Sequence, residues 1–181
     1  MKNFFSQYFN TLNDHLENYD ELFLNKLTDL ILETSKKKKK IIISGNGGSS
    51  ATASHFAVDL TKNARVRAIN FNETDLITCF SNDYGYENWV AKSLEFYADK
   101  GDLLILISCS GNSKNLVKAN KYAKKNKIKI VTLTGCQKNN LLNKQRNDLK
   151  FWLDSKNYNH IEIIHHLMLL SVVDKIISVK N

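Results

Sequence analysis

Residues 41–55 read IIISGNGGSSATASH, and this stretch decides the fold that the rest of the chain must fit. It opens with apolar β-branched residues suited to a buried strand, passes through three glycines and continues into a run of small hydroxyl residues. Glycine permits positive φ and lets a ligand approach main-chain N–H groups, while a helix N-terminus offers unpaired N–H donors and the positive end of a dipole. The stretch therefore predicts a strand, an anion-binding turn and the start of a helix.

Two familiar phosphate-binding motifs do not match this turn. A GxGxxG motif would need glycine where Ser50 stands, and a P-loop would need a Gly-Lys-Ser/Thr sequence, which the chain lacks. The sequence thus argues against the dinucleotide-binding and P-loop nucleotide-hydrolysing classes.

A second turn repeats the construction. The apolar run LLILIS (residues 103–108) leads into SCSGNS (residues 108–113), which again opens a helical pattern. Either turn alone could be a capped helix start, because Ser, Asn and Gly are favoured there. Two such turns in one sheet favour a phosphorylated and polyhydroxylated ligand, and a sugar phosphate sooner than a nucleotide.

Apolar strand patterns alternate with helical patterns along the chain. The expected strands are 41–44, 66–71, 103–108, 130–134 and 149–153, and the expected helices are 1–34, 50–60, 74–81, 87–97, 113–125 and 161–177. Such alternation is typical of a parallel sheet covered by helices on both faces, which is a three-layer α/β fold. Ligands of these sheets bind at the carboxyl ends of strands, so the two glycine-containing turns mark the predicted site.

Length and charge bound the class of protein. With 181 residues and 43% hydrophobic content, the chain suits one domain over residues 1–181. The net charge of +8 and the lysine run 36–40 raise the question of nucleic-acid binding. That run follows a helical pattern, directly precedes a strand and lacks interleaved aromatic residues. We therefore expect it to complement a helix C-terminus, and we expect no nucleic-acid partner.

The cysteines and the N-terminal residues bear on the compartment. Cys79, Cys109 and Cys136 are odd in number and share no CxxC spacing, which argues against a disulfide framework and a structural zinc site. The chain has no recognisable secretory signal and no apolar run long enough to span a membrane. We expect a cytoplasmic protein with free thiols and no membrane contact.

The motifs GNGGS (45–49), the helix carrying His55, NDYG (82–85) and SCSGNS (108–113) together resemble the SIS (sugar isomerase) domain family, and within it the phosphoheptose isomerases. The resemblance implies a five-stranded parallel sheet flanked by helices and a homotetramer with sites between subunits. Extra N-terminal helices, here within residues 1–40, would then serve oligomerisation. It further implies zinc and the conversion of sedoheptulose 7-phosphate to D-glycero-D-manno-heptose 7-phosphate, a precursor of bacterial surface polysaccharide.

Matching positions carry the family's substrate contacts onto this chain. The residues implied at the sugar are Asn46, Gly47, Gly48, Ser49, Asn82 and Asp83. Those implied at the phosphate are Ser108, Cys109, Ser110 and Ser113. We interpret Cys109 as a neutral, space-filling thiol, because no base stands near it in the sequence. Asp83 is expected in a turn after a helix, where capping is the alternative to substrate binding.

The implied metal site departs from the family pattern. Where the family has histidine and glutamate one turn apart, this chain has His55 and Asp59. Where the family has glutamine and, eight residues later, histidine, this chain has Glu162 and Leu170. His166 lies one turn before Leu170 on the same helix face and is the available replacement. The resulting zinc set is His55, Asp59, Glu162 and His166; the neighbouring histidines of the C-terminal helix are open to a core or surface interpretation.

Isomerisation between an aldose and a ketose removes a proton alpha to a carbonyl, passes through an enediol and returns a proton to the neighbouring carbon. Asp59 and Glu162 are the candidate bases, and His166 is the candidate acid. Two other classes stay open: a catalytically silent SIS protein that binds a phosphosugar as a regulator, and an assembly protein that binds another macromolecule.

Overall fold

The computed structural model describes residues 3–180, which form five strands and seven helices. The strands make one parallel sheet, as the sequence predicted, and their order is β2-β1-β3-β4-β5. Their bounds are β1 Ile41–Gly45, β2 Ala68–Asn70, β3 Leu103–Ser108, β4 Lys129–Thr134 and β5 Leu149–Trp152. The helices are α1 Phe4–Glu17, α2 Glu21–Lys36, α3 Gly48–Lys62, α4 Thr74–Tyr84, α5 Trp89–Tyr97, α6 Lys114–Lys125 and α7 Tyr158–Lys180.

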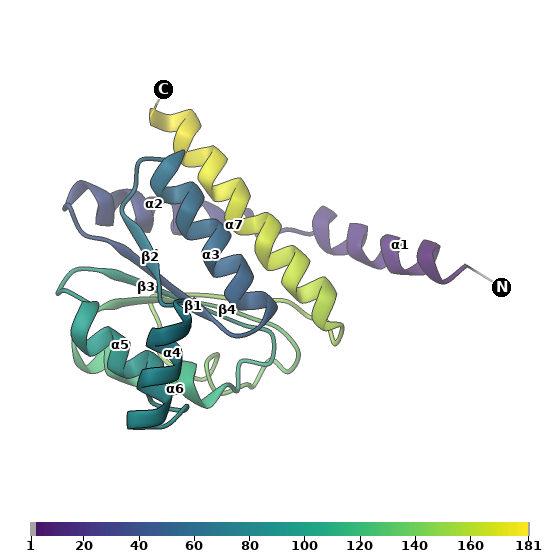
Figure 1. Ribbon diagram of the computed structural model, residues 1–181. Helices are drawn as coiled ribbons and strands as arrows, with labels where there is room; N and C mark the ends of the chain where they lie inside the picture. The colour runs from purple at the N-terminus through teal and green to yellow at the C-terminus, as the bar shows by residue number, and fades with distance from the viewer. Residues whose placement is uncertain (1–2, 181) are drawn as a thin grey trace.

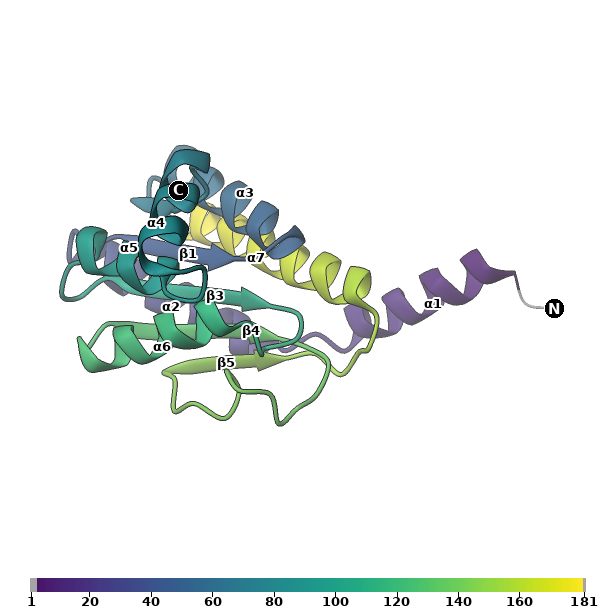
Figure 2. The same cartoon turned by 60° about the horizontal axis from the view of Figure 1, so that its bottom comes forward.

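Helices cover both faces of the sheet, with α2, α3 and α7 on one side and α5 and α6 on the other (Figures 1 and 2). Successive side chains of a strand point to opposite faces, so the alternation within β1 feeds two cores. Ile41 and Ile43 pack with the α2, α3 and α7 layer, whereas Ile42 packs with the α5 and α6 layer. The buried apolar runs therefore produce the predicted three-layer fold.

The register of the central strands places the two predicted turns side by side. Gly45 at the end of β1 pairs with Ile107 near the end of β3. Because the strands are parallel, the loops that follow them leave the same edge of the sheet. The first loop leads into α3 and the second into α6, so two helix N-termini meet at this edge.

The N-terminal region is two helices, where the sequence predicted one continuous helical segment. Helix α1 ends at Glu17 with Asn18 as its C-cap. Asp20 then caps the start of α2 by accepting a hydrogen bond from the Phe23 backbone N–H. Helix α1 has no buried residue and extends away from the sheet, as Figure 2 shows. Its exposed face carries Phe4, Phe5 and Phe9.

Other element bounds differ from the expectation in ways that affect the site. Strand β2 is shorter than the predicted 66–71, and α7 begins three residues earlier than predicted, at Tyr158. Helix α4 continues to Tyr84, so Asp83 lies in its last turn and not in a turn after it. Within residues 3–180, no helix is both long and apolar enough to cross a membrane.

Candidate functional site

The first turn is shaped for close approach to the backbone. Gly47 has φ +55° and acts as the N-cap of α3, in a conformation that other residues adopt only with strain. Gly48 is the first residue of α3, and a Cβ there would overlap the carboxylate of Glu162 from α7. The bare backbone thus lets an acidic side chain rest against a helix N-terminus, where the dipole favours negative charge.

The second turn, residues 108–113, also combines a glycine of positive φ with a helix N-terminus. Gly111 has φ +63°, and its backbone N–H donates to the Ser108 hydroxyl at 3.1 Å. Ser113 is the N-cap of α6, and its hydroxyl lies 3.4 Å from that of Ser108. Its side chain makes no capping hydrogen bond to α6, so its hydroxyl is available to a ligand.

A pair of amides joins the two turns. The Asn46 side-chain Nδ2 donates to Asn115 Oδ1 at 3.0 Å, and Asn46 Oδ1 accepts from Asn115 Nδ2 at 2.9 Å. The Tyr86 hydroxyl also donates to the Asn46 oxygen at 3.3 Å. Asn115 is buried in the first turn of α6, so this reciprocal contact fixes the spacing between the loops. Asn115 was not predicted as a site residue, because only the fold pairs it with Asn46.

The two turns enclose a cleft of about 210 Å³ at the carboxyl ends of β1 and β3. Seven predicted site residues line it: Asn46, Ser49, Ser108, Cys109, Ser110, Ser113 and Glu162. Tyr158 also lines the cleft and was not predicted, since the early start of α7 puts it there. The lining is rich in hydroxyl and amide groups, which suit a polyhydroxylated ligand.

Cys109 is buried at the floor of this cleft. Its Sγ lies 3.9 Å from the Ser49 hydroxyl and 3.8 Å from the Glu162 carboxylate. Burial raises the pKa of the Cys109 thiol to about 11, and the Glu162 charge adds to that rise. The thiol is therefore neutral near pH 7, in agreement with the space-filling role predicted for it.

Glu162 lines both this cleft and a second hollow of about 310 Å³. The second hollow lies between α3 and α7 and also receives Thr52 and His166. Glu162 and His166 are four residues apart on α7, so both project toward α3. The predicted acid and the predicted base therefore lie along one wall.

Two histidines from different helices meet beside the second hollow. His55 Nδ1 lies 3.0 Å from His166 Nε2, and the other ring nitrogen of His55 lies 3.3 Å from the Asp59 carboxylate. The Thr52 hydroxyl contacts His166 Nδ1 at 3.2 Å. Burial lowers the pKa of the His166 imidazole, and the neighbouring His55 lowers it further. His166 is thus neutral near pH 7.

The predicted zinc set is not assembled as a set of four. Asp59 approaches the ring nitrogen of His55 that points away from His166, so it stands behind His55 as an outer partner. Glu162 contacts Cys109 and the backbone of Gly48, and not the two imidazoles. Across residues 3–180, no group of three or more His, Cys, Asp or Glu side chains is arranged to hold a metal ion. As they are placed here, these four side chains do not form a closed zinc site, and zinc stays a prediction.

Four predicted substrate contacts do not line the cleft: Gly47, Gly48, Asn82 and Asp83. Gly48 lines the second hollow instead. Asn82 and Asp83 are exposed in the last turn of α4, where the Asn82 amide donates to the Asp83 carboxylate at 3.0 Å. Their role in binding stays a prediction.

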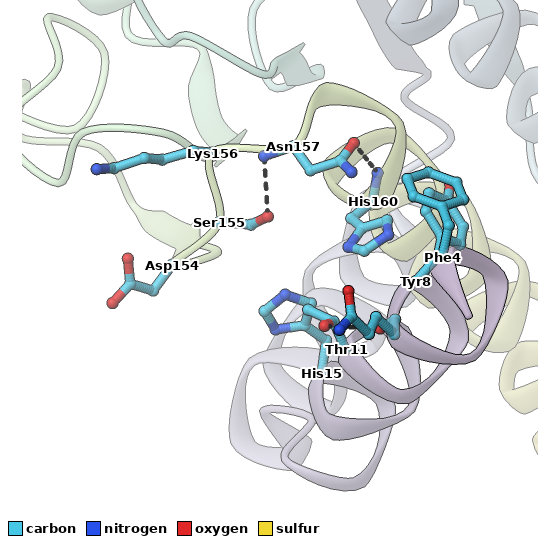
Figure 3. Close-up of a pocket in the computed structure, with 10 residues that line it drawn as sticks. Phe4, Tyr8, Thr11, His15, Asp154, Ser155, Lys156, Asn157 and His160 are labelled. Carbon is cyan, nitrogen blue, oxygen red and sulfur yellow. Dashed lines mark hydrogen bonds between the residues drawn. The ribbon is translucent and has the colours of Figure 1, made fainter. Parts of the chain in front are cut away.

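The remaining histidines of α7 are buried. His165 is fully buried, with Nε2 3.3 Å from the Thr134 carbonyl oxygen, and burial lowers its pKa to about 4. His160 borders a hollow of about 600 Å³ between α1 and the segment before α7, where it lies near Tyr8 and His15 (Figure 3). His165 is thus a core residue, as one of the two sequence interpretations had it.

The sheet order and the paired glycine turns define the SIS domain class, and comparison with known proteins agrees. The family model described as the SIS domain matches residues 4–135. The phosphoheptose isomerase of Cytophaga hutchinsonii is 39% identical over 154 residues, covering 80% of this chain and 81% of that protein. The phosphoheptose isomerase of Helicobacter pylori is 35% identical over 169 residues, with 90% and 86% covered.

Solved structures give the same result. The phosphoheptose isomerase of Francisella tularensis superposes with a TM-score of 0.87 at 25% identity, covering 95% of each chain. That of Neisseria gonorrhoeae gives 0.85 at 27% identity, with 92% of each chain covered. This chain therefore belongs to the phosphoheptose isomerase family of SIS domain proteins.

Proposed function

We propose that this protein is an aldose–ketose isomerase that converts sedoheptulose 7-phosphate to D-glycero-D-manno-heptose 7-phosphate, for the synthesis of surface polysaccharide. The names of its relatives support the reaction. The single observation that carries the proposal for this chain is the carboxylate of Glu162, held at the mouth of a hydroxyl-lined cleft between two helix N-termini. A carboxylate in that place suits proton transfer at a carbon beside a carbonyl.

The phosphate of the substrate binds at the second turn in this proposal. Ser108, Ser110 and Ser113 offer hydroxyl donors there, and α6 adds unpaired N–H groups and its positive dipole end. The turn at Asn46 and Gly47 then receives the sugar hydroxyls. This orientation leads the carbon chain of the sugar toward Glu162.

Glu162 removes the proton alpha to the carbonyl, exchanges it with solvent, and delivers a proton to the neighbouring carbon. The enediol also requires a proton to move between the two sugar oxygens, and we assign that exchange to His166, whose hollow adjoins the Glu162 carboxylate. Asp59 was predicted as a second base. Its contact with His55 gives it an orienting role instead.

Zinc stays a prediction of the family resemblance. The two facing imidazoles are suitable ligands, but Asp59 and Glu162 do not join them, and Leu170 offers no donor. No step of the proposed mechanism uses a metal ion.

A homo-oligomer, with a tetramer as the expected form, completes the proposal. Helix α1 exposes Phe4, Phe5 and Phe9 and buries none of its residues within one chain. An apolar helix face of this kind is stabilised by burial against another subunit. Sedimentation velocity of the full chain measures the assembly, and a monomer at micromolar concentration would contradict this part.

The decisive experiment incubates the protein with sedoheptulose 7-phosphate in deuterated water and follows aldose signals and C–H exchange by NMR. We expect product with deuterium at the carbon that receives the proton. Glu162→Gln lowers kcat about a thousandfold, because the general base is lost. Asp174→Asn, which removes an exposed carboxylate from the same helix, is the matched control and retains activity.

A catalytically silent phosphosugar-binding protein is the second candidate, and the departures at Asp59 and Leu170 favour it. The same experiment separates the two functions. A folded protein that binds the sugar phosphate, as measured by calorimetry, but gives neither product nor exchange would overturn the isomerase and support the silent binder.

A further inference from the structure

The contacts around His166 form a continuous line of four side chains. They run from Thr52 through His166 and His55 to Asp59, over distances of 3.2, 3.0 and 3.3 Å. Three of the four residues come from α3, and His166 comes from α7. The line therefore crosses the interface between the two helices that border the second hollow.

The chemistry of the end group fixes the direction of this line. An ionised carboxylate only accepts hydrogen bonds, so the His55 nitrogen that faces Asp59, Nε2, carries a proton. With one N–H on each ring, His55 Nδ1 accepts, and the proton between the rings belongs to His166 Nε2. His166 Nδ1 is then left as an acceptor, and among residues 3–180 the donor that faces it is the Thr52 hydroxyl.

We propose that Thr52, His166, His55 and Asp59 form a one-way hydrogen-bond chain with a proton between the two imidazoles, and that Thr52 is a positioning residue. Its hydroxyl donates to the acceptor nitrogen Nδ1 of His166 and holds that ring at the wall of the hollow. The inference rests on the proposed function for its catalytic meaning, but the hydrogen-bond chain itself does not. Neither Thr52 nor the tautomers follow from the motifs of the sequence.

A metal ion bridging the rings would require the opposite arrangement at His166. Both His55 Nδ1 and His166 Nε2 would then present lone pairs, and His166 Nδ1 would have to donate to Thr52. The two arrangements thus differ in a single observable, which is the ring nitrogen of His166 that carries the proton. The outer position of Asp59 and the separate position of Glu162 favour the proton.

The chain also has a consequence for the reaction. His166 Nδ1 and the Thr52 hydroxyl lie at the wall of the hollow that Glu162 borders. When a sugar hydroxyl gives up its proton, the Thr52 hydroxyl turns away from Nδ1, whose lone pair then receives that proton. The same proton returns to the other sugar oxygen as the enediol collapses, and Thr52 donates to Nδ1 again. No external reactant is required, and the neutral ring is restored at the end of the cycle.

Nitrogen-15 NMR of the histidine-labelled, full-length protein tests the proposal without substrate. We expect His55 and His166 both as Nε2–H tautomers, in protein whose metal content is measured by elemental analysis. Thr52→Val, which removes the hydroxyl at nearly constant volume, keeps the Nε2–H tautomer of His166 but shifts its Nδ1 resonance because the donor is lost, and Thr52→Ser restores that resonance. Thr78→Val makes the same chemical change on exposed α4 and is the control. An Nδ1–H tautomer of His166, or stoichiometric zinc held by both rings, overturns the proposal.

Kinetics provide the second readout. Thr52→Val lowers kcat about fivefold to tenfold with KM unchanged, Thr52→Ser restores it, and a chelator has no effect. An unchanged kcat in Thr52→Val contradicts the positioning role. Absence of turnover in every sample, with the expected tautomers present, overturns the proposed function and leaves the hydrogen-bond chain supported.

Discussion

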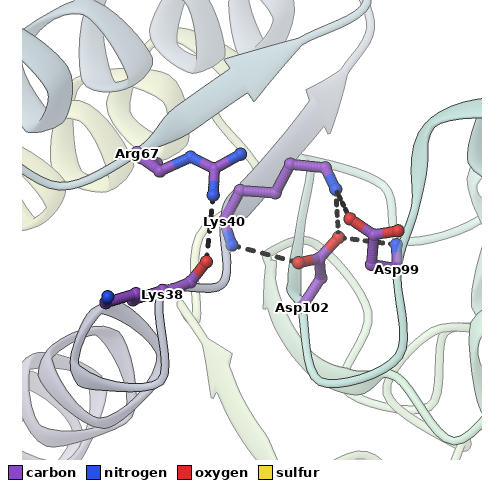
Figure 4. A network of polar contacts seen from close by, with 5 residues as sticks. All are labelled: Lys38, Lys40, Arg67, Asp99 and Asp102. Atoms are coloured by element: carbon purple, nitrogen blue, oxygen red, sulfur yellow. Dashed lines mark hydrogen bonds and ion pairs between the residues drawn. The ribbon is translucent and has the colours of Figure 1, made fainter.

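The two ends of the central sheet differ in how their polar groups are paired. At the amino ends of β1 and β3, the Asp102 carboxylate is fully buried and accepts from the Lys40 and Asp99 backbone N–H groups at 3.0 and 2.8 Å. The Lys40 ammonium lies 2.7 Å from both Asp102 and Asp99, and Arg67 donates to the Lys38 carbonyl oxygen nearby (Figure 4). Polar groups at this end are satisfied by one another.

At the carboxyl ends, the polar groups surround a cleft. Hydroxyls of Ser110 and Ser113 and the N-termini of α3 and α6 face the space that a ligand would fill. Buried polar groups cost free energy unless they are paired, so an end that pairs them internally serves stability. An end that leaves donors around a cleft serves binding. The difference indicates where mutations change folding and where they change activity.

The position of Lys40 at the amino end differs from the prediction for the lysine run 36–40. Helix α2 ends at Lys36, two residues beyond the predicted end, so the run begins at a helix C-terminus as predicted. Lys40, however, belongs to this buried network and not to the helix terminus. Burial by itself lowers the pKa of the Lys40 ammonium, but the Asp102 and Asp99 carboxylates outweigh it and raise that pKa above its usual value. The charged lysine is thus part of the folded structure.

The largest expected effect falls on stability at the amino end. Asp102→Asn leaves the Lys40 ammonium without its buried counter-charge and lowers the free energy of unfolding by about 3 kcal/mol. Urea denaturation measures this loss, while activity per folded molecule stays unchanged. Asp99→Asn is the control and has a far smaller effect, because its side chain is 65% exposed. Equal losses in the two variants would contradict this account.

The buried His165, which has no ionic partner among residues 3–180, has a comparable effect on the free energy of unfolding. This effect depends on pH. The pKa of His165 is about 4 in the folded protein and near 6.5 when unfolded, so the unfolded state binds more protons between these values. The free energy of unfolding therefore falls by about 3 kcal/mol as pH drops from 6.5 to 4. His165→Gln, which keeps an N–H donor for Thr134, should show a shallower decline over the same range. An unaltered pH profile would refute the assignment.

Gly48→Ala tests whether the carboxyl end of the sheet serves activity more than stability. The new methyl group overlaps the Glu162 carboxylate and displaces it, so kcat falls about a hundredfold. The free energy of unfolding stays equal or rises by about 0.5 kcal/mol, because alanine favours the helix and only the end of a flexible side chain must move. Thermal denaturation together with isomerase kinetics makes the measurement. A variant that loses stability and keeps activity would reverse the assignment of this end.

The smallest effect is expected at the phosphate turn. Ser113→Ala removes one hydroxyl from the cleft and raises KM about fivefold, with kcat and stability nearly unchanged. Ser178→Ala, near the exposed end of α7, is the matched control. Initial rates over a range of substrate concentrations separate the two parameters, and a change in kcat alone would argue against a phosphate contact.

The sequence by itself determined the local units of this protein. The apolar runs, the glycines at 47 and 111 and the hydroxyl residues after each strand specify two strand–turn–helix units through short-range physics. The alternation of such units predicted the parallel sheet and located the site at its carboxyl edge. The split of the N-terminal helix was missed, although Asp20 is a recognisable N-cap.

Only the tertiary structure decided which side chains meet. The Asn46 amide meets Asn115, the Gly48 backbone meets Glu162 and the His55 ring meets His166, and each partner lies more than sixty residues away along the chain. These meetings depend on how α6 and α7 are rotated about their axes, and the packing of their buried faces against the sheet sets that rotation. Hydrophobic periodicity predicts which face of a helix is buried, but core packing decides which residues that face contacts.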